Sequence, residues 1–557
     1  MVLSVSDLSI KFEGTRPFTA VNHLSFQIGK GETLAIVGES GSGKSLTALA
    51  IMGLLPKAAT SHGAMTLQVA GKELPLTNSS RAQLRGKEMG MVFQEPMSAL
   101  NPVMSIGRQL KEAIMQHQAI TGAAGKQLAM DWLDKVQLPE PPKIYDRYPH
   151  QLSGGQKQRV MIAMAMCNHP ALLIADEPTT SLDATVQQEI IRLMRYLQDE
   201  HQSAMIFITH DLSLAAAIAN DVLVMYKGEA VEYGKSSQVL QQPQHPYTRA
   251  LLACRPSPGQ KGHRLPVVAD FMVTEEVAPH PKELPTVPLV VAKEDDSIKE
   301  PLLTVSDLGV WFPENKDMLG RPVSYFKAVD DVSFSLHKGE VLGLVGESGC
   351  GKSTLSKSLV GLLPVHSGSI LFDGKDLAQM PLHQWHDVRR QIQMIFQDPY
   401  SSLNPRMTIG DMLMEQLMVH KIVPARELQK EAVRLLDLVQ LPASSLHHYP
   451  HQFSGGQRQR IGIARALALR PQLLLCDESV SALDVSIQAQ ILNLLKDLQQ
   501  EFQLTYIFIS HDLSVVHYIS DRILVMRNGK IVESGTADQV LSQPENAYTQ
   551  RLIAAMT

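Results

Sequence analysis

"GESGSGKS" occupies residues 38–45, and "GESGCGKS" occupies residues 346–353, which begins 308 positions further along the chain. Each stretch follows a short apolar run, "TLAIV" or "VLGLV", and precedes a run with apolar residues at helical spacing. Both fit G-x-x-x-x-G-K-[ST], a pattern in which backbone N–H groups surround phosphate oxygens between a strand and a helix. The sequence therefore predicts a phosphate-binding loop twice in one chain.

The loops are part of a longer repetition, because further landmarks recur in the same order at offsets of 301 to 303. The recurring pairs are "MVFQEPMSALNP" (91–102) with "MIFQDPYSSLNP" (394–405), "YPHQLSGGQKQR" (148–159) with "YPHQFSGGQRQR" (449–460), "LLIADEPTTSLD" (172–183) with "LLLCDESVSALD" (473–484), and "IFITHDLS" (206–213) with "IFISHDLS" (507–514). The sequence therefore indicates an internal duplication.

Composition is consistent with a globular chain of at least two domains, because single cores stop growing near about 250 to 300 residues and this chain has 557. Its 51 basic and 56 acidic residues leave no strongly basic field that would attract nucleic acid. No basic, then apolar, leader is found at the N-terminus, and no apolar run approaches the roughly 18 residues of a membrane span. Four scattered cysteines argue against zinc or a disulfide framework, so we expect a protein of the cytosol.

The chain divides into residues 1–254, a linker at 255–300 and residues 301–557. The linker is rich in proline and carries the cluster "KEDDSIKE", which favours an extended tether over a third packed domain. Within each half, short apolar strands alternate with helical stretches, which predicts an α/β fold with a mainly parallel sheet. The stretch at about 102–148 has helical periodicity without strand signals, so we expect an inserted helical subdomain there.

The residues of the two loops have distinct expected roles. Lys44 and Lys352 should reach the β and γ phosphates of a nucleotide, and Ser45 and Ser353 should offer hydroxyls to Mg²⁺. The helix that begins in each loop adds the positive end of its dipole, equivalent to about half a charge. The glycines whose missing side chains admit the phosphates are Gly38, Gly41 and Gly43 in the first loop and Gly346, Gly349 and Gly351 in the second.

Each half also has an acidic pair at the end of an apolar strand. Asp176 and Asp477 would hold Mg²⁺ through water, and Glu177 and Glu478 lie where a base could polarise an attacking water. Paired acids at a strand end can instead be solvated turn residues, but their recurrence after a phosphate-binding loop favours function. The histidines that follow the next strand, which could contact a γ-phosphate or be structural, are His210 and His511.

"LSGGQ" (152–156) and "FSGGQ" (453–457) resemble the signature motif of ABC-type ATPases, and the ordered set of motifs covers nearly the whole chain. The resemblance implies two tandem P-loop NTPase domains, each with an antiparallel β part, that pair head to tail within the chain so that each ATP lies between one P-loop and the opposite signature. It also implies that Asp183 and Asp484 link the two sites. The remaining residues that it implies for binding and catalysis are Gln94 and Gln397, as magnesium ligands with a catalytic part, and Ser153, Gly154, Gly155, Gln156, Ser454, Gly455, Gly456 and Gln457 around the nucleotide.

Three details stay open at this stage. Phe12 and Phe312 lie where the family stacks an aromatic ring on adenine, with Phe18 and Phe326 as rivals and a core role as the alternative. Cys350 lies in a loop where amides favour anions, so we expect a lowered thiol pKa, unless it is an inert replacement of Ser42. The second half departs from the first at Ser479 and Ala482, but both lysines and both glutamates remain, which predicts two competent sites and leaves open whether they are equal.

The "FQEPMSALNP" and "FQDPYSSLNP" stretches, with "HPYTRALLA" and "NAYTQRLIA", resemble the peptide and nickel branch of bacterial ABC importers. That resemblance implies ATP and Mg²⁺, two membrane permeases bound near Gln94 and Gln397, an external solute-binding protein, and a peripheral place on the cytoplasmic face of the inner membrane. Only Cys254 lies near the region where relatives hold iron and sulfur, so we expect no such cluster. By this resemblance we expect the ATP-hydrolysing motor subunit of an importer for peptides, such as dipeptides, oligopeptides, glutathione or a microcin C-like peptide. The alternatives are a nickel or other small-solute importer, an exporter, and a ribosome-associated double ATPase.

Overall fold

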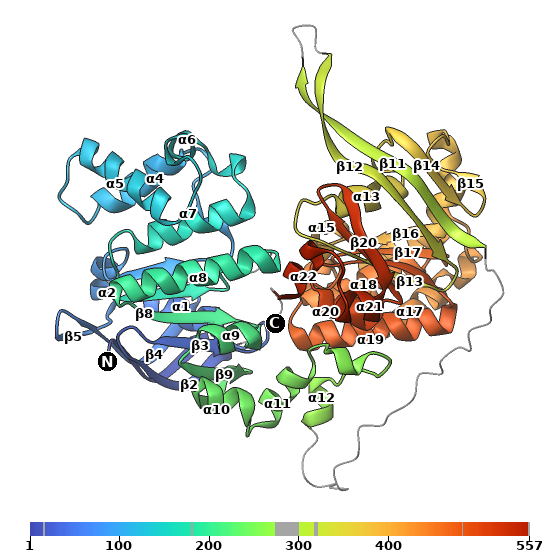
Figure 1. Ribbon diagram of the computed structural model, residues 1–557. Coiled ribbons are helices and arrows are strands. Elements are labelled where there is room, and N and C mark those ends of the chain that lie inside the picture. Colours follow the sequence, from blue (N-terminus) through green and yellow to red (C-terminus); the bar gives the residue numbers. More distant parts are fainter. Residues whose placement is uncertain (15–16, 180–181, 273–299, 317–320, 482, 555–557) are drawn as a thin grey trace.

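The computed structural model describes residues 1–14, 17–179, 182–272, 300–316, 321–481 and 483–554. Two halves of similar architecture lie side by side, the N-terminal half in blue to green and the C-terminal half in yellow to red (Figure 1). Most of the predicted linker, residues 273–299, lies outside the described residues, as does Ala482. Among the helices in the described ranges, we find none with both the length and the apolar character that a bilayer crossing requires.

A six-stranded sheet forms the centre of each half. The strands of each sheet are parallel to one another, with one exception. The strand that comes last in the sequence of each half pairs antiparallel at one edge. The strands in spatial order are β10 (Glu229–Lys235), β9 (Asp221–Tyr226), β3 (Thr33–Val37), β8 (Ala204–Thr209), β7 (Leu172–Asp176) and β6 (Met89–Val92), and β16 (Ile392–Ile395), β17 (Leu473–Asp477), β18 (Thr505–Ile509), β13 (Val341–Val345), β19 (Arg522–Arg527) and β20 (Lys530–Thr536). Every residue of β3 and of β13 is buried, as strands covered on both faces require.

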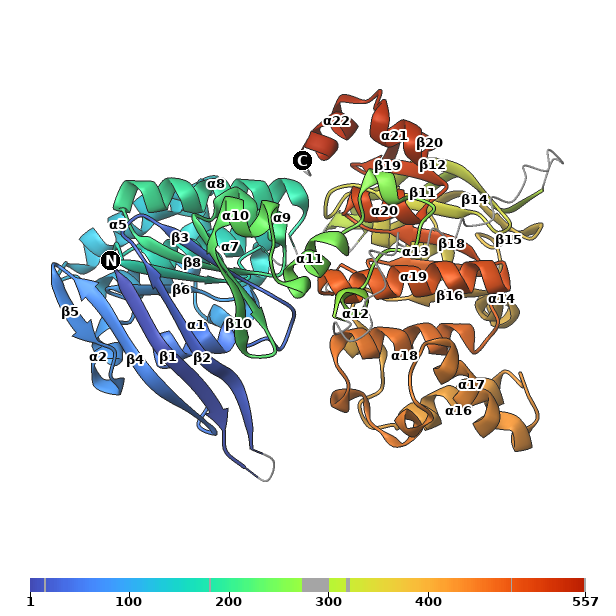
Figure 2. The same cartoon turned by 90° about the horizontal axis from the view of Figure 1, so that it is seen from below.

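A second, antiparallel sheet lies beside each central sheet. Figure 2 shows that the antiparallel sheet of the first half lies on the side opposite the helix α8 (Ala184–His201). The strands in spatial order are β2 (Phe18–Ile28), β1 (Leu3–Phe12), β4 (Ala59–Val69) and β5 (Lys72–Pro75), and β12 (Pro322–His337), β11 (Pro301–Lys316), β14 (Ser367–Phe372) and β15 (Lys375–Asp376). The hairpin β11–β12 is longer than β1–β2 and extends beyond the rest of its half (Figure 1). The predicted α/β class with an antiparallel part is confirmed.

Helices cover the sheets, and one group of them forms the helical subdomain predicted at about 102–148. In the first half the helices are α1 (Lys44–Met52), α2 (Asn78–Leu84), α3 (Pro96–Ala99), α4 (Ile106–Met115), α5 (Gly122–Lys135), α6 (Pro141–Asp146), α7 (Gly154–Met166), α8 (Ala184–His201), α9 (Leu212–Ile218), α10 (Ser236–Gln241) and α11 (Pro246–Ala253). Helices α4, α5 and α6 pack on one another, and α4 and α5 also contact α7. Buried Ile106, Leu110, Trp132 and Leu133 share a hydrophobic cluster with α7, so the subdomain is joined to the core through that helix.

The second half repeats this arrangement. Its helices are α13 (Lys352–Leu359), α14 (Trp385–Gln391), α15 (Pro399–Ser402), α16 (Ile409–Val419), α17 (Leu428–Leu438), α18 (Gly455–Leu467), α19 (Val485–Phe502), α20 (Leu513–Ile519), α21 (Ala537–Ser542) and α22 (Ala547–Ala554). Helices α16, α17 and α18 contact one another as α4, α5 and α7 do. The duplication read from the sequence is therefore a duplication of structure.

The start of the predicted linker is folded. A 3₁₀ turn at Pro258–Gln260 and the short helix α12 (Val268–Phe271) follow α11, and this turn contacts α20 of the second half. The extended tether predicted from proline content is therefore wrong for residues 255–272. Leu265 is only 1% exposed and belongs to the core cluster of the second half, so burial of an apolar side chain outweighs the preference of the neighbouring prolines for extended chain.

Candidate nucleotide-binding sites

The first P-loop connects β3 to α1 in a conformation that requires glycine. Gly38 and Gly43 have positive φ angles of 151° and 101°. A Cβ on Gly38 would come within 2.2 Å of the Met225 carbonyl oxygen, and one on Gly43 within 2.9 Å of the Ala20 carbonyl oxygen. The space around Gly41 is open, so its positive φ of 82° is what favours glycine there.

Lys44 begins α1 and folds back over this loop. Its Nζ donates hydrogen bonds to the carbonyl oxygens of Gly38, at 2.7 Å, and Glu39, at 2.9 Å. The side chain is buried, and burial lowers the pKa of Lys44 although the carboxylates around it oppose that shift. A buried, partly desolvated ammonium is suited to interact with phosphate oxygens.

The second P-loop has the same geometry. Lys352 Nζ donates to the carbonyl oxygens of Gly346 and Glu347 at 2.7 Å and 2.9 Å. A Cβ on Gly346 would approach the Met526 carbonyl oxygen to 2.2 Å, and one on Gly351 would approach the Ala328 carbonyl oxygen to 2.2 Å. Gly349, like its counterpart Gly41, has a positive φ of 81° in open space.

The hydroxyl and the aspartate predicted to hold a metal ion are brought together in both halves. Ser45 Oγ donates to Asp176 Oδ1 at 2.9 Å, and Ser353 Oγ donates to Asp477 Oδ1 at 3.1 Å. Burial raises the pKa of both aspartates, and the serine hydrogen bonds only partly offset it. Because a carboxylate that burial destabilises gains from a nearby cation, these oxygen pairs fit a Mg²⁺ ion.

Gln94, Glu177 and His210 converge at the first site from three different elements. Gln94 Nε2 donates to Glu177 Oε2 at 2.9 Å, and His210 Nδ1 lies 3.5 Å from the same oxygen. Glu177 follows β7 with a φ of 44°, in the left-handed region, which turns its side chain toward the other two. Burial disfavours the charged imidazole, but the hydrogen bond and charge of Glu177 outweigh it and raise the pKa of His210.

Gln397, Glu478 and His511 repeat this cluster. Gln397 Nε2 donates to Glu478 Oε2 at 2.7 Å, and His511 Nδ1 lies 3.8 Å from that oxygen. Burial would raise the pKa of Glu478, but His511 overcomes this effect and lowers it, while the pKa of His511 rises. A glutamate held as the charged form between an amide and an imidazole can accept a proton from water.

Each signature motif lies at the N-terminus of a helix. Ser153 Oγ accepts a hydrogen bond from Gln156 N, and Gln156 Oε1 accepts one from Ser153 N, which closes a capping box at the start of α7. Ser454 and Gln457 repeat the box on α18. The serines and the first glycines, Gly154 and Gly455, are exposed, whereas a Cβ on Gly155 would lie 2.8 Å from Val186 and one on Gly456 would lie 2.4 Å from Ile487.

The two halves touch through each P-loop and the segment that follows the acidic pair of the other half. Asp484 Oδ1 accepts hydrogen bonds from Ser40 N at 3.0 Å and Ser40 Oγ at 3.1 Å. The hydroxyl of Ser486 donates to Glu39, and Thr185 Oγ1 donates to Glu347 Oε1 at 3.3 Å. The contacts therefore run from each half to the P-loop of the other.

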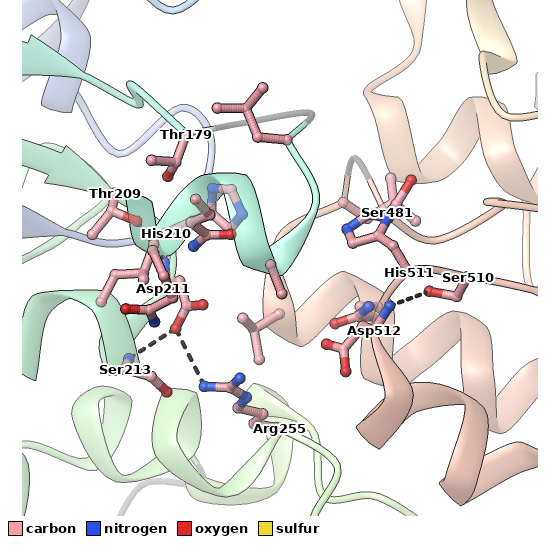
Figure 3. A pocket seen from close by; sticks show the side chains of 18 of the residues that line it. Thr179, Thr209, His210, Asp211, Ser213, Arg255, Ser481, Ser510, His511 and Asp512 are labelled. Carbon is pink, nitrogen blue, oxygen red and sulfur yellow. Dashed lines mark hydrogen bonds and ion pairs between the residues drawn. The ribbon is translucent and has the colours of Figure 1, made fainter. Parts of the chain in front are cut away.

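Figure 3 shows a cavity of about 200 Å³ between the halves, with His210 and Asp211 on one side and His511 and Asp512 on the other. Asp211 Oδ1 accepts a hydrogen bond from Ser213 N at 2.8 Å and one from Arg255 at 3.4 Å. A larger pocket of about 430 Å³ lies over the second P-loop. Within the described part of the chain, the signature residues of the first half do not line that pocket, so the structure does not bring them to Lys352.

The aromatic candidates for adenine form pairs. Phe12 and Phe18 stack with their ring centroids 4.9 Å apart and their planes 1° from parallel. Phe312 and Phe326 are strand neighbours in β11 and β12, and both line the pocket over the second P-loop. Both rivals in each half therefore lie together, and the choice between them stays open.

The prediction of a lowered thiol pKa at Cys350 is wrong. The side chain is only 6% exposed, and a Cβ on Gly346 would lie 2.7 Å from its sulfur, so the thiol points into the base of the loop. Burial raises the pKa of Cys350 and outweighs the opposing charge and hydrogen bonds of Lys352, whose Nζ lies 3.8 Å from the sulfur.

Sequence reasoning missed the loop residues that contact the opposite half. Glu39 and Ser40 occupy variable positions of the P-loop pattern, yet "GES" opens both loops. The identical dipeptide at the variable positions of two repeats was a signal that could have identified them. Ser486 and Thr185 carried no such signal, because their role depends on how the halves pack.

Comparison with known proteins agrees with this geometry. The family model described as "ABC transporter" matches residues 21–180 and 329–481, and the model described as "Oligopeptide/dipeptide transporter, C-terminal region" matches residues 231–276. The chain belongs to the ABC transporter family and is one of its ATP-binding, ATP-hydrolysing proteins.

Curated relatives match the whole chain. It is 48% identical over 563 residues to the glutathione import ATP-binding protein GsiA of Escherichia coli strain K12, covering 100% of this chain and 89% of that protein. Its identity to the protein of the same name from Pectobacterium atrosepticum is 46% over 566 residues, with the same coverage. A solved dimeric ATP-binding cassette bound to ADP and phosphate is 26% identical, with a TM-score of 0.39 over 42% of this chain and 98% of that one.

Proposed function

We propose that this chain is the ATP-hydrolysing motor subunit of a bacterial importer for peptides, of which glutathione or a short oligopeptide is the favoured cargo. The observation that carries the proposal is the 48% identity to a glutathione import ATP-binding protein across 100% of the chain. The match of residues 231–276 to the C-terminal region of oligopeptide and dipeptide transporters supports the same cargo class.

At each site the residues divide the work of hydrolysis. Lys44 and the loop amides hold the β and γ phosphates, while Ser45, Gln94 and Asp176 provide oxygen ligands for Mg²⁺. Held by these three residues, Mg²⁺ would supply positive charge to offset the negative charge of the phosphates. Lys352, Ser353, Gln397 and Asp477 do the same in the second half.

Glu177 and Glu478 are the proposed general bases. Each is held by a glutamine amide and an imidazole at distances of 2.7–3.8 Å, which fixes the carboxylate where it can take a proton from the attacking water. His210 and His511 stabilise the charged form of these carboxylates, and we propose that they also contact the γ-phosphate.

Both sites are proposed to be composite. Ser454, Gly455 and Gly456 present a hydroxyl, backbone N–H groups and a helix N-terminus, which together favour the γ-phosphate of an ATP held by Lys44. Ser153, Gly154 and Gly155 act likewise for the ATP on Lys352. The contact of Ser40 with Asp484 supports this pairing, because it already joins the first P-loop to the half that carries Ser454.

The motor acts on partners in the membrane. We propose that two permease subunits bind near Gln94 and Gln397, where exposed apolar side chains such as Phe93, Met97 and Tyr400 offer contact area. An external solute-binding protein delivers the cargo, and the chain lies at the cytoplasmic face of the inner membrane.

The proposal is tested by reconstitution with two candidate permease subunits, in liposomes supplied with a candidate solute-binding protein. We expect ATP turnover to rise several-fold when that protein is loaded with glutathione or a short peptide, and labelled cargo to accumulate. A complex that turns over ATP faster with Ni²⁺ and ignores every peptide would contradict the peptide assignment. The matched control is the Lys44→Ala/Lys352→Ala chain, which should not respond to any cargo.

A further inference from the structure

Residues 258–272, called the clasp below, belong to the first half by connection but pack on the second half. They follow α11, which itself contacts α19. Both views place α11 at the junction of the halves and α12 beside α19 (Figures 1 and 2). Leu265 of the clasp is buried in a hydrophobic cluster that otherwise consists almost wholly of second-half residues.

The side-chain amide of Asn493, on α19, forms hydrogen bonds with both the backbone N–H and the backbone carbonyl of one clasp residue. Leu265 N donates to Asn493 Oδ1 at 3.0 Å, and Asn493 Nδ2 donates to the Leu265 carbonyl oxygen at 2.9 Å. Asn493 is only 3% exposed. Its amide therefore replaces the backbone partner that a neighbouring strand would give, in a place that water does not reach.

Tyr518, on α20, forms a second attachment to the clasp. Its hydroxyl donates to the His263 carbonyl oxygen at 2.9 Å and approaches Asn493 Oδ1 to 3.3 Å. The ring is 1% exposed. Asn493 and Tyr518 thus form one buried polar group whose hydrogen bonds are completed by the clasp.

Ion pairs surround this group at the surface. Lys261 Nζ lies 3.3 Å from Asp538, and Arg264 Nη1 lies 3.1 Å from Asp497. Asp538 and Arg264 are 70% and 62% exposed, so solvent screens these pairs and they contribute little. The buried hydrogen bonds and Leu265 carry the attachment.

The receptor for the clasp exists on one half only. The positions of the first half that match Asn493 and Tyr518, 301 residues earlier, hold Arg192 and Ala217. Neither side chain could replace the paired amide and phenol. The two residues of the second half are therefore a specific device and not a shared feature of the duplicated fold.

The root of the clasp also reaches the first ATP site. Arg255, which lies between α11 and the clasp, donates to Asp211, the neighbour of His210. Arg255 lines the cavity between the halves in Figure 3. If one half rotates against the other about the clasp, the axis of rotation therefore lies close to His210.

We propose that the clasp is a permanent hinge, which keeps the two halves of one chain together at one edge whether or not nucleotide is bound. The ATP sites then open and close by rotation about this edge, and they pair within one chain and not between two chains. This inference rests on the proposed composite sites for its consequence, but the attachment itself stands on the contacts above.

The test cuts the chain after purification. A protease site is inserted within residues 273–299, which lie outside the described ranges, so that cleavage leaves the clasp on the first half. Without nucleotide, we expect the cut chain to elute from a sizing column as one species. The cut Asn493→Ala/Tyr518→Phe chain should elute as two species, each about half the size.

Two further variants separate loss of the clasp from loss of folding. Leu265→Asp changes only the clasp and should release the halves as the double variant does, while circular dichroism stays unchanged. Arg192→Ala in the first half is the matched control and should leave the halves together. Separation of the cut parent chain without nucleotide, or persistence of a single species in both clasp variants, would overturn the hinge.

This measurement is independent of transport. A parent chain whose cut halves separate, yet which drives peptide uptake when uncut, would remove the hinge and leave the proposed function intact. A chain whose cut halves stay together but which responds to no peptide would leave the hinge intact and remove the proposed function.

Discussion

The two proposed ATP sites have nearly the same residues, but each receives different contacts from the opposite half. At the first site Asp484 accepts two hydrogen bonds from Ser40, whereas at the second site the matching Asp183 caps its own helix by accepting from Val186 N at 2.9 Å. Among the described residues, only the Thr185 hydroxyl hydrogen-bonds to the second P-loop across the interface, at 3.3 Å from Glu347. The difference teaches that two copies of a motif need not make two equal sites, because packing between the copies decides what each receives.

Electrostatics follow the same division. Burial raises the pKa of Glu39 in the first loop, with Asp484 adding to that effect while Ser486 opposes it. Burial also lowers the pKa of Lys44. Asp484 and Ser486 of the opposite half thus act directly on the first P-loop, so we expect it to be the site whose turnover depends more on the interface.

The largest expected effect is loss of the general bases, which tests what the sites share. Glu177→Gln or Glu478→Gln should slow ATP turnover by about 10² to 10⁴, because an amide cannot accept a proton from water. Phosphate release at saturating ATP measures it. Glu200→Gln, a change at the surface end of α8, is the control and should leave turnover unchanged. Normal turnover in both variants would show that neither glutamate is the general base.

The next effect distinguishes the two sites. Asp484→Ala should reduce turnover about thirtyfold, since it removes two hydrogen bonds to Ser40 that are worth roughly 1 kcal/mol each, and about 1.4 kcal/mol is a factor of ten. Asp183→Ala should instead lower stability by about 1 kcal/mol through loss of the helix cap, with a smaller change in turnover. Steady-state ATPase and thermal melting of both variants measure this. Equal kinetic losses would show that the sites are held alike.

A smaller effect concerns the thiol that distinguishes the second P-loop. Because burial raises the pKa of Cys350, iodoacetamide should label it at least several-fold more slowly than free glutathione at pH 7.5, and faster as the pH rises. ATP should slow labelling further. Peptide mass spectrometry follows the modification, and Cys350→Ser, which gives the serine found at position 42, should keep normal turnover. If Cys350 were labelled faster than glutathione, the lowered thiol pKa expected from the sequence would be correct after all.

The smallest effect concerns a histidine pair of the first half, in which His169 is exposed and His201 is half-buried. Burial lowers the pKa of His169 and of His201, whose rings lie 4.2 Å apart; Lys135 lowers both further, and Glu200 opposes this. The unfolded chain therefore binds more protons, so stability from this pair is present above about pH 6.5 and is lost as the pH falls below it.

His201→Phe places in the first half the residue found at the matching position 502. We expect the melting temperature to fall by a few degrees less between pH 8 and pH 6 than in the parent chain. His420→Gln serves as a comparison in the second half, because burial also lowers the pKa of His420. Identical pH dependence in the parent and His201→Phe chains would contradict this origin.

Much of the site could be predicted because its residues lie in contiguous motifs. A P-loop sets its own backbone through Gly38 and Gly43, and the ends of parallel strands bring Glu177 and His210 to one edge of the sheet, where Gln94 reaches them. The strand–helix alternation that predicted an α/β core is likewise a local signal. These features need no knowledge of how the halves pack.

The rest depends on packing that sequence does not encode locally. Proline content predicted an extended tether, but the buried side chain of Leu265 and the amide of Asn493 fold the segment onto the second half. The position of Cys350 in a loop rich in amides predicted an acidic thiol, but the direction of its side chain decides the pKa. The contact between Ser40 and Asp484 required the arrangement of both halves.

The central claim is that each ATP is held between the P-loop of one half and the signature of the other. A structure of the Glu177→Gln/Glu478→Gln chain with ATP and Mg²⁺ tests it directly. The account predicts the Ser454 hydroxyl and a backbone N–H of Gly455 or Gly456 within about 3 Å of the γ-phosphate of the ATP on Lys44, and Ser153 in the same relation to the ATP on Lys352. A γ-phosphate contacted by residues of a single half, with both signature serines distant, would contradict it.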